Sequence, residues 1–282
     1  MKVSVIDAGN FKLDGGAMFG IIPKLLWQKY VPADENNLCT WKTRCLLVEE
    51  GKKLTLIDTG MGDKQPQKWQ SYYYRHGEGD LIKSIRAAGY HESDVSDVIL
   101  SHLHFDHCGG ALFLDKNTLE PVPTFENANY WTHSKHWDWA QTSNPKEKGT
   151  FLNENINPLQ LHGVLKFIDR TDNHFSDNWE FLYADGHTEK MIMPIINVNG
   201  QKIAFAADCV PSHAHIHIPY VMAYDNFPLT TMTEKEHLFQ KLIEENIALV
   251  FDHDAVHEAA FVEKTEKGYI STFLGELTEI IK

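Results

Sequence analysis

The chain has 282 residues, of which 43% are hydrophobic and 23% charged, as in ordinary globular proteins with a sizeable core. Its net charge of −13, with no cluster of lysine and arginine, argues against nucleic acid and anionic membranes as partners, because both need clustered cations. No apolar run approaches the ~20 residues of a spanning helix, and residues 1–7 resemble a strand rather than a signal peptide, so we expect a cytoplasmic protein.

The glycine-rich segment at residues 9–20 follows the predicted N-terminal strand and contains Met18 and Phe19. It lacks the glycine order of a dinucleotide-binding loop. Its composition predicts either a flexible surface loop or a loop that places apolar side chains over a pocket.

A hairpin and a helix are predicted before residue 100. The apolar runs at 44–48 and 53–57 predict two strands, with a turn at 49–52 between them. Residues 80–88 place apolar side chains three and four positions apart, which predicts a helix that Gly89 ends.

The stretch 101–110, Ser-His-Leu-His-Phe-Asp-His-Cys-Gly-Gly, holds three histidines and one aspartate within six residues. The apolar run at 95–100 predicts a buried strand just before it, so the cluster lies where open α/β sheets bind their ligands. Histidines two positions apart cannot share a helical face, and they converge only if the chain turns sharply off the strand. Imidazole and carboxylate donors suit zinc, iron, manganese or cobalt, so this stretch predicts a metal site.

Residues 129–132 predict a strand, and residues 134–141 predict a helix rich in aromatic side chains. His133 and His136 are either a second ligand set or histidines packed among aromatics, and the need to bury the aromatics favours packing. Residues 143–177 are irregular and rich in asparagine, and we expect them to contain helical pieces and to form a lid or pocket wall.

In the second half, Asn199-Gly200 predicts a tight hairpin turn, and Thr233 is a plausible helix N-cap. We expect strands at 180–183, 191–198, 202–206 and 247–251, and helices at 233–245 and 273–281.

Polar residues follow each of several predicted strands: Asp58, the cluster at 102–107, His187, Asp208 and His253. Any one of them alone could be a turn residue or a cap. Together they indicate one rim of polar side chains.

These motifs, in this order, resemble the metallo-β-lactamase superfamily, whose mark is His-x-His-x-Asp-His. The resemblance covers nearly the whole chain and implies an α/β fold, the four-layer αββα metallo-β-lactamase sandwich, in one domain over residues 1–282. It also implies a cofactor of two divalent metal ions, with Zn²⁺ preferred and Mn, Fe or Co as alternatives. By the resemblance, one metal is held by His102, His104 and His187, the second by Asp106, His107 and His253, both are bridged by Asp208, and Asp58 orients a ligand imidazole.

The N-terminal loop and residues 219–225 resemble the branch of quorum-quenching lactonases and organophosphate hydrolases. This resemblance implies an enzyme in which a hydroxide shared by two metals cleaves a lactone, ester or phosphoester, with an acyl-homoserine lactone favoured. Asp106 or Asp208 would relay a proton. The chain departs from the family at Thr188-Glu189-Lys190, where many members have Pro-Gly, and in having no tyrosine directly after Asp208.

Two alternatives to a hydrolase remain. One is an iron-dependent oxidoreductase of the same fold, either a thiol dioxygenase or a di-iron enzyme. The other is a non-catalytic binding protein. The full ligand set disfavours the mono-iron dioxygenase and the non-catalytic protein, and the di-iron enzyme is disfavoured because no C-terminal flavin domain is expected.

The substrate is expected to be a small molecule, and the candidate pocket residues are Met18, Phe19, Trp27, His213, Tyr220 and Tyr224. His213, His215 and His217 alternate, so a strand would point all three the same way, as a third metal site or as a polar pocket rim.

The four cysteines show no CxxC spacing and are expected to be free thiols. Cys108 and Cys209 each follow a predicted ligand, and packing is favoured over a redox role. Exposed aromatics around residues 131–139 would allow a homodimer.

Overall fold

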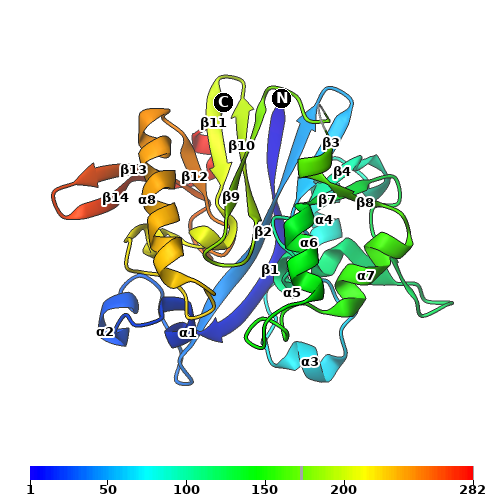
Figure 1. Cartoon of the computed structure of the whole chain (residues 1–282), viewed down its shortest axis with the longest axis horizontal. Coiled ribbons are helices and arrows are strands. Elements are labelled where there is room, and N and C mark those ends of the chain that lie inside the picture. The colour runs from blue at the N-terminus through cyan, green and yellow to red at the C-terminus, as the bar shows by residue number, and fades with distance from the viewer. Residues whose placement is uncertain (172–173, 282) are drawn as a thin grey trace. The chain divides into compact units, whose positions relative to one another are not determined.

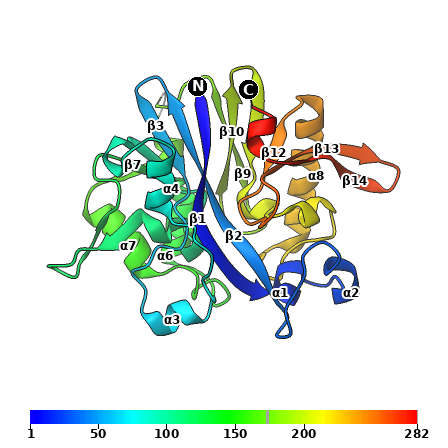
Figure 2. The ribbon, with the colours of Figure 1, turned by 180° about the vertical axis from the view of Figure 1, so that it is seen from behind.

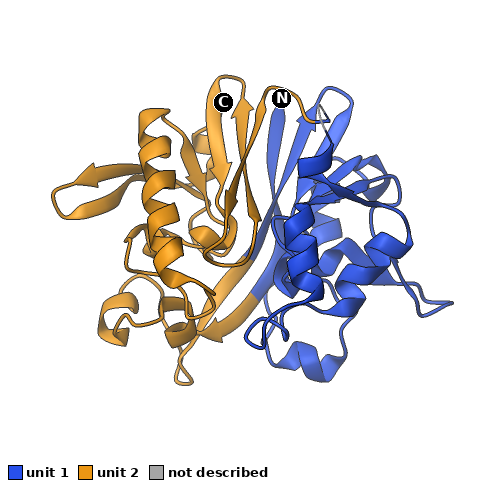
Figure 3. Cartoon of the chain, in the orientation of Figure 1, with its two compact units in different colours: residues 1–10, 43–174 blue, residues 11–42, 175–282 orange. Residues whose placement is uncertain are grey.

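The computed structural model describes residues 1–171 and 174–281, and they form two compact units (Figure 3). Unit 1 comprises residues 1–10 and 43–174, and unit 2 comprises residues 11–42 and 175–282. The chain passes between them three times, first inside the long strands β1 (Lys2–Asp14) and β2 (Leu38–Glu50) and then between His174 and Phe175. Among the described helices, none is long and apolar enough to cross a membrane.

Unit 1 is built on a sheet whose strand order is β1-β2-β3-β4-β7-β8. Strands β3, β4, β7 and β8 run parallel, so their carboxyl ends meet at one edge of the sheet. The remaining elements of this unit are β3 (Lys53–Ile57), β4 (Asp97–Ile99), β5 (Leu112–Leu114), β6 (Pro121–Pro123), β7 (Asn129–Thr132), β8 (Leu165–Phe167), α3 (Gln67–Ser71), α4 (Leu81–Ala87), α5 (Phe105–Cys108), α6 (Ser134–Gln141) and α7 (Asn153–Leu161), with 3₁₀ turns at Glu92–Asp94, Gly109–Ala111 and Ile168–Arg170.

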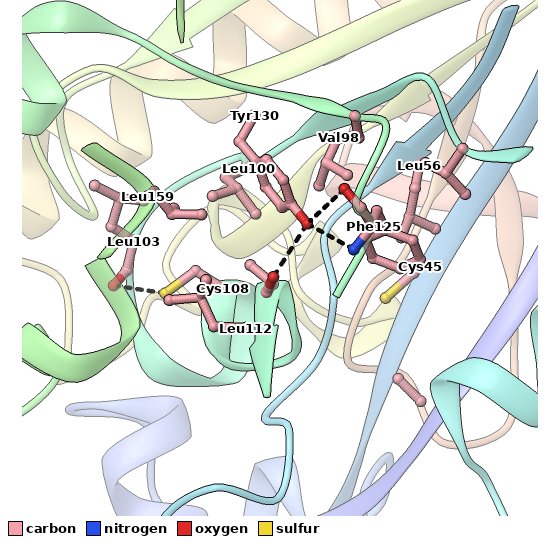
Figure 4. Packing of buried hydrophobic residues seen from close by; sticks show 14 of the residues in the cluster. Cys45, Leu56, Val98, Leu100, Leu103, Cys108, Leu112, Phe125, Tyr130 and Leu159 are labelled. Carbon is pink, nitrogen blue, oxygen red and sulfur yellow. Dashed lines mark hydrogen bonds between the residues drawn. The ribbon is translucent and has the colours of Figure 1, made fainter. Parts of the chain in front are cut away.

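The core of unit 1 joins the sheet to the helices α4, α6 and α7 and to the stretch after β4 (Figures 1 and 4). Leu103 and Cys108 of that stretch are fully buried in this core. Nearby, the hydroxyl of Tyr130 accepts from the backbone N–H of Phe125 at 2.9 Å and donates to the carbonyl of Ala111 at 3.1 Å. The predicted metal-binding stretch at 101–110 is therefore fixed to the core of unit 1 by its own apolar side chains.

Unit 2 is built on a sheet of order β14-β13-β12-β11-β10-β9, against which the long helix α8 packs (Figures 1 and 2). Strands β11 and β12 are parallel, so their carboxyl ends lie side by side. The elements of this unit are α1 (Gly15–Phe19), α2 (Lys24–Trp27), β9 (Trp179–Ala184), β10 (Met191–Val198), β11 (Gln201–Phe205), α8 (Pro228–Glu244), β12 (Ala248–Val250), β13 (Ala259–Thr265) and β14 (Gly268–Gly275), with 3₁₀ turns at Ala207–Cys209, His213–Ile216 and Leu277–Glu279.

Several local predictions are confirmed. The side chain of Asp80 caps α4 by accepting from the backbone N–H of Lys83 at 2.8 Å, and Gly89 follows the helix with φ +95°. Asn199 and Gly200, with φ of +53° and +98°, form the turn between β10 and β11. Strand β7 and helix α6 have the predicted bounds.

Other predictions are wrong. Residues 9–20 are no loop: β1 continues to Asp14, whose side chain then caps α1 by accepting from the N–H of Ala17. Helix α8 begins at Pro228 rather than at Thr233, because proline suits the first turn of a helix. The predicted C-terminal helix at 273–281 does not form: residues 273–275 belong to strand β14, where pairing with β13 outweighs helical spacing, and only the 3₁₀ turn Leu277–Glu279 follows.

The segment 143–177 contains the helical pieces predicted for it, helix α7 and a 3₁₀ turn, and also strand β8. Residues 172 and 173 of this segment lie outside the described part of the chain. Its proposed role as a lid or pocket wall stays a prediction.

Candidate metal centre

In unit 1, the candidate ligands are arranged around Asp58, which follows β3 with φ +59°. One carboxylate oxygen of Asp58 accepts from the backbone N–H of Ser101 at 2.7 Å. The other accepts from the Ser101 hydroxyl at 2.8 Å and from Nδ1 of His107 at 2.9 Å. The Ser101 hydroxyl in turn lies 3.1 Å from Nδ1 of His102. Asp58 therefore orients two imidazoles, one directly and one through a serine.

His104 forms its hydrogen bond through Nε2, whereas His102 and His107 form theirs through Nδ1. Its Nε2 donates to Glu147 at 3.1 Å, so Nδ1 is the nitrogen left for a ligand. Glu147 is buried, and its second oxygen accepts from the indole N–H of Trp139 at 2.7 Å and from Asn144 at 3.1 Å. The ring centroids of His102 and His104 lie 4.5 Å apart. The sharp turn after β4 thus brings the two histidines together, as the sequence predicted.

The turn after β4 depends on very close backbone packing. A Cβ at Gly109 would lie 2.0 Å from the carbonyl oxygen of Met61. The backbone N–H and the hydroxyl of Thr59 both donate to the carbonyl of His107, at 2.7 and 2.9 Å. These contacts fix helix α5, which carries Asp106 and His107, against the loop that follows β3.

In unit 2, the candidate ligands meet around Asp208, which lies in the 3₁₀ turn after β11. One oxygen, Oδ2, lies 3.0 Å from Nε2 of His187, in the turn after β9. The other, Oδ1, lies 3.1 Å from Nε2 of His253, after β12. A single carboxylate therefore faces a different histidine with each of its two oxygens.

The two histidines of unit 2 are each supported at the other ring nitrogen. Nδ1 of His187 donates to Asp225 at 2.9 Å, and Nδ1 of His253 donates to the backbone carbonyl of Lys42 at 2.6 Å. Burial opposes protonation of His187, but the carboxylates of Asp208 and Asp225 raise its pKa to about 10. The same negative charge favours a divalent cation at Nε2.

The residues fit divalent metals by the chemistry of their donors. Imidazole nitrogens stand beside carboxylate oxygens in both units, a donor set that suits Zn²⁺, Mn²⁺, Fe²⁺ or Co²⁺. Metal-binding histidines are usually held at their second nitrogen by a carboxylate or carbonyl, as His107, His187 and His253 are here. Each unit by itself thus presents oriented side chains that suit a metal ion.

Three residues of this arrangement were missed in the sequence. Asp252 directly precedes His253, and its Oδ2 lies 3.6 Å from Nε2 of that histidine. It is the first polar residue after β12, so the same strand-end signal that selected His253 could have found it. Asp225 and Glu147, by contrast, lie far along the chain from the histidines they hold, and no local pattern marks them.

Three of the predicted pocket residues are almost fully buried in unit 2: Met18 and Trp27 are 1% exposed and Phe19 is 0% exposed. The rings of Phe19 and Trp27 stack with centroids 5.1 Å apart, and Phe19 stacks on His215 at 4.8 Å. These side chains form an aromatic core, while His213, Tyr220 and Tyr224 keep more exposure.

The alternating histidines at 213–217 are not on a strand. They lie in and just after a 3₁₀ turn, and each has a different neighbour. Nδ1 of His213 donates to Asp254 at 2.5 Å, His215 donates to the carbonyl of Met18 at 2.9 Å, and His217 accepts from Tyr30 at 3.0 Å. In the part of the chain that the structure describes, these histidines are in no cluster of three metal donors.

The aromatic side chains around residues 131–139 were predicted to be exposed, and this prediction is wrong for Trp131 and Trp137. Trp131 and Trp137 are buried, so this surface gives no reason to expect a homodimer. His136 accepts from the backbone N–H of Leu103 at 2.8 Å, and His133 caps helix α6. The ring of His136 also lies 5.8 Å from that of Phe151, which agrees with the interpretation of this histidine as packed among aromatics.

All four cysteines are buried free thiols, as predicted. Burial raises the pKa of Cys108 to about 12 and raises that of Cys209 still further, so neither is a thiolate at neutral pH.

Comparison with known proteins gives consistent results. The metallo-beta-lactamase superfamily model matches residues 41–250. An N-acyl homoserine lactonase of Bacillus cereus is 27% identical over 119 residues, which are 39% of this chain and 43% of that protein. The chain thus spans less than half the length of this curated relative.

Two solved structures share the fold. A probable metal-dependent hydrolase from Staphylococcus aureus is 26% identical, with a TM-score of 0.84 over 97% of this chain and 96% of that one. A dizinc quorum-quenching lactonase, solved with its product, is 22% identical, with a TM-score of 0.76 over 95% of this chain and 92% of that one. The predicted metallo-β-lactamase α/β fold is confirmed. Since the family model matches well over half of the residues, the chain belongs to the metallo-β-lactamase superfamily.

Proposed function

We propose that this chain is a dinuclear metal-dependent hydrolase of lactones, esters or phosphoesters, with acyl-homoserine lactones as the favoured substrates. The observation that carries the proposal is Asp208, whose two oxygens face His187 and His253 separately at 3.0 and 3.1 Å. A carboxylate in this position can bridge two cations. Membership of the superfamily and the similarity to lactonases support the same reaction class.

In this proposal both units contribute ligands, so residues 1–282 act as one functional domain. Zn²⁺ is the favoured metal because a neighbour of this fold is a dizinc lactonase, and Mn, Fe or Co would suit the same donors. The ligands would be His102, His104 and His187 for one metal, Asp106, His107 and His253 for the other, and Asp208 for both.

Two divalent metals, when bound, lower the pKa of water from ~15.7 to ~7 and polarise the carbonyl or phosphoryl oxygen of a substrate. The protein orients the imidazoles that would hold these metals, since Asp58 positions His107 in unit 1 and Asp225 positions His187 in unit 2. Asp106 or Asp208 would accept the proton of the attacking water and return it to the leaving oxygen.

The small-molecule substrate would be contacted by the more exposed candidates, His213, Tyr220 and Tyr224. His213 lines a cavity of about 260 Å³ in unit 2 together with Tyr30 and Trp41. Met18, Phe19 and Trp27 would shape the pocket from behind, since they are buried in the aromatic core.

The test combines metal analysis with a substrate panel. Purified protein should carry close to two metal ions per chain. Acyl-homoserine lactones, aryl esters and phosphotriesters should be compared before and after chelation and after metal is restored. We expect turnover of at least one class, its loss with chelator, and its recovery with Zn²⁺. A metal content of one or less, or turnover that survives complete metal removal, would contradict the proposal.

A further inference from the structure

The buried carboxylate of Asp252 has no role in the ligand assignment above. It is 1% exposed and follows β12, directly before His253. Its Oδ1 accepts from the backbone N–H of His253 at 3.0 Å, and its Oδ2 lies 3.6 Å from Nε2 of the same residue. Asp252 is grouped with Asp208 and His253 among buried donors whose ligand atoms are close enough to hold one metal ion.

We propose that Asp252 is an additional carboxylate ligand of the cation at the His253 position. The inference rests on the proposed dinuclear function and extends it. With Asp252 the ion would have five ligands, and neighbouring donors about 2.1 Å from such an ion lie roughly 3.0–3.6 Å from one another. Nε2 of His253 lies 3.1 Å from Oδ1 of Asp208 and 3.6 Å from Oδ2 of Asp252, close to that spacing on both sides.

The two oxygens of Asp252 face different groups. The hydrogen bond from the backbone of His253 involves Oδ1, and an asparagine or serine could accept it equally well. Oδ2 is the atom directed toward Nε2 of His253. The ligand atoms of Asp208, Asp252 and His253 lie within 4.8 Å of one another. A cation bound between these three residues would be stabilised by the negative charge of Asp252.

As a consequence, the two metal positions differ in their proportion of carboxylate oxygen to imidazole nitrogen donors. At the His187 position, unit 2 offers one imidazole and Oδ2 of Asp208. At the His253 position, it offers one imidazole, Oδ1 of Asp208 and the carboxylate of Asp252. Carboxylate-rich sites suit Mn²⁺ and other oxygen-seeking ions better than nitrogen-rich sites do. The His253 position should therefore hold Mn²⁺ better, relative to Zn²⁺, than the His187 position.

The experiment compares metal binding of wild-type protein, Asp252→Asn and the control Asp97→Asn. Asp97 is also a buried aspartate, 2% exposed, but it accepts from the indole N–H of Trp131 in unit 1. Metal-free protein is titrated with Zn²⁺ and with Mn²⁺ by calorimetry, and the visible absorption of the Co²⁺-loaded protein reports coordination number.

We expect two binding events in the wild type and in Asp97→Asn. In Asp252→Asn, one event should weaken by at least about tenfold, and more for Mn²⁺ than for Zn²⁺, while the other is unchanged. The absorption of one Co²⁺ should change to that of a lower coordination number. Unchanged affinities and an unchanged Co²⁺ spectrum in Asp252→Asn would overturn the inference and leave the hydrolase proposal standing.

Failure of the proposed function has a different signature, because the wild type itself would then bind fewer than two metals. If Asp252→Asn does not fold, as judged by circular dichroism and thermal melting, Asp252→Ser replaces it. Serine keeps an acceptor for the backbone N–H of His253 and lacks the second oxygen. The same loss of one binding event is expected, and its absence overturns the inference.

Discussion

The two units orient their candidate metal ligands in different ways. In unit 1, His102 and His107 lie in one short stretch after β4, and both depend on the single carboxylate of Asp58. In unit 2, His187 and His253 follow different strands, and each has its own support, Asp225 or the carbonyl of Lys42. In unit 1 a single residue, Asp58, orients both imidazoles, whereas in unit 2 each imidazole is oriented by a different residue. A change at Asp58 should therefore disturb more of the site than a change at any one support in unit 2.

The largest expected effect tests whether hydrolysis needs ligands from both unit 1 and unit 2. Asp208→Ala in unit 2 and His104→Ala in unit 1 should each lower hydrolysis by about 10³-fold or more, because each removes a proposed metal ligand. Steady-state rates against the best substrate of the panel measure this loss, and circular dichroism checks that the fold is kept. Near-normal turnover in either variant would remove that residue from the site.

A smaller effect compares the supports directly. Asp58→Asn and Asp225→Asn should each weaken metal binding by about 10–100-fold, since both residues hold a ligand imidazole. We expect the greater loss for Asp58→Asn, which disturbs His102 as well as His107. Competition with a chelator gives the affinities. Equal losses would show that sharing one support has no special consequence.

Each unit also holds a loop by means of a lysine, which is half-buried in unit 1 and fully buried in unit 2. Lys64 donates to the carbonyls of Gly109 and Leu112 in unit 1, and Lys235 donates to those of His217, Ile218 and Tyr220 in unit 2. Burial lowers the pKa of Lys64 to about 8 and that of Lys235 to about 7, from the usual 10.5.

The unfolded chain therefore binds more protons than the folded one between pH 7 and 10.5, so the unfolding free energy should rise with pH in that window. The contribution of Lys235 is complete above pH 10.5 and is lost as the pH falls through about 7. Lys235 alone changes the unfolding free energy by at most about 1.4 kcal/mol per pH unit. Urea unfolding at several pH values measures it. Lys235→Met should flatten the rise more than Lys64→Met, and an unchanged slope in both would contradict the assigned pKa values.

The smallest effect concerns the cysteine that follows a candidate ligand in each unit. Cys108 and Cys209 are both buried, and burial raises the pKa of both thiols. Because the thiolate is the reactive form, neither should be alkylated in the native protein at pH 8, and both should react after denaturation. Mass spectrometry of labelled protein reads the result. Rapid native labelling of only one would mark its unit as the less tightly packed.

Local features were predictable because they depend on neighbours in the chain. The histidine stretch at 102–107, the turn at Asn199-Gly200 and the capped helix α4 are examples. Residues 9–20 were misjudged because glycine content is a local signal, whereas β1 is held in place by its sheet. The predicted helix at 273–281 failed for the same reason, since β14 owes its conformation to pairing with β13.

The sequence by itself determined the superfamily, the types of metal donor and the predicted ligands, because these residues stand at strand ends in a recognisable order. Only the tertiary structure decided which groups orient them. Asp225 and Glu147 lie 38 and 43 positions from the histidines they contact, and no spacing along a chain encodes such a pair. The role of Asp252 also needed the structure, because the direction of a carboxylate depends on how β11 and β12 pack side by side.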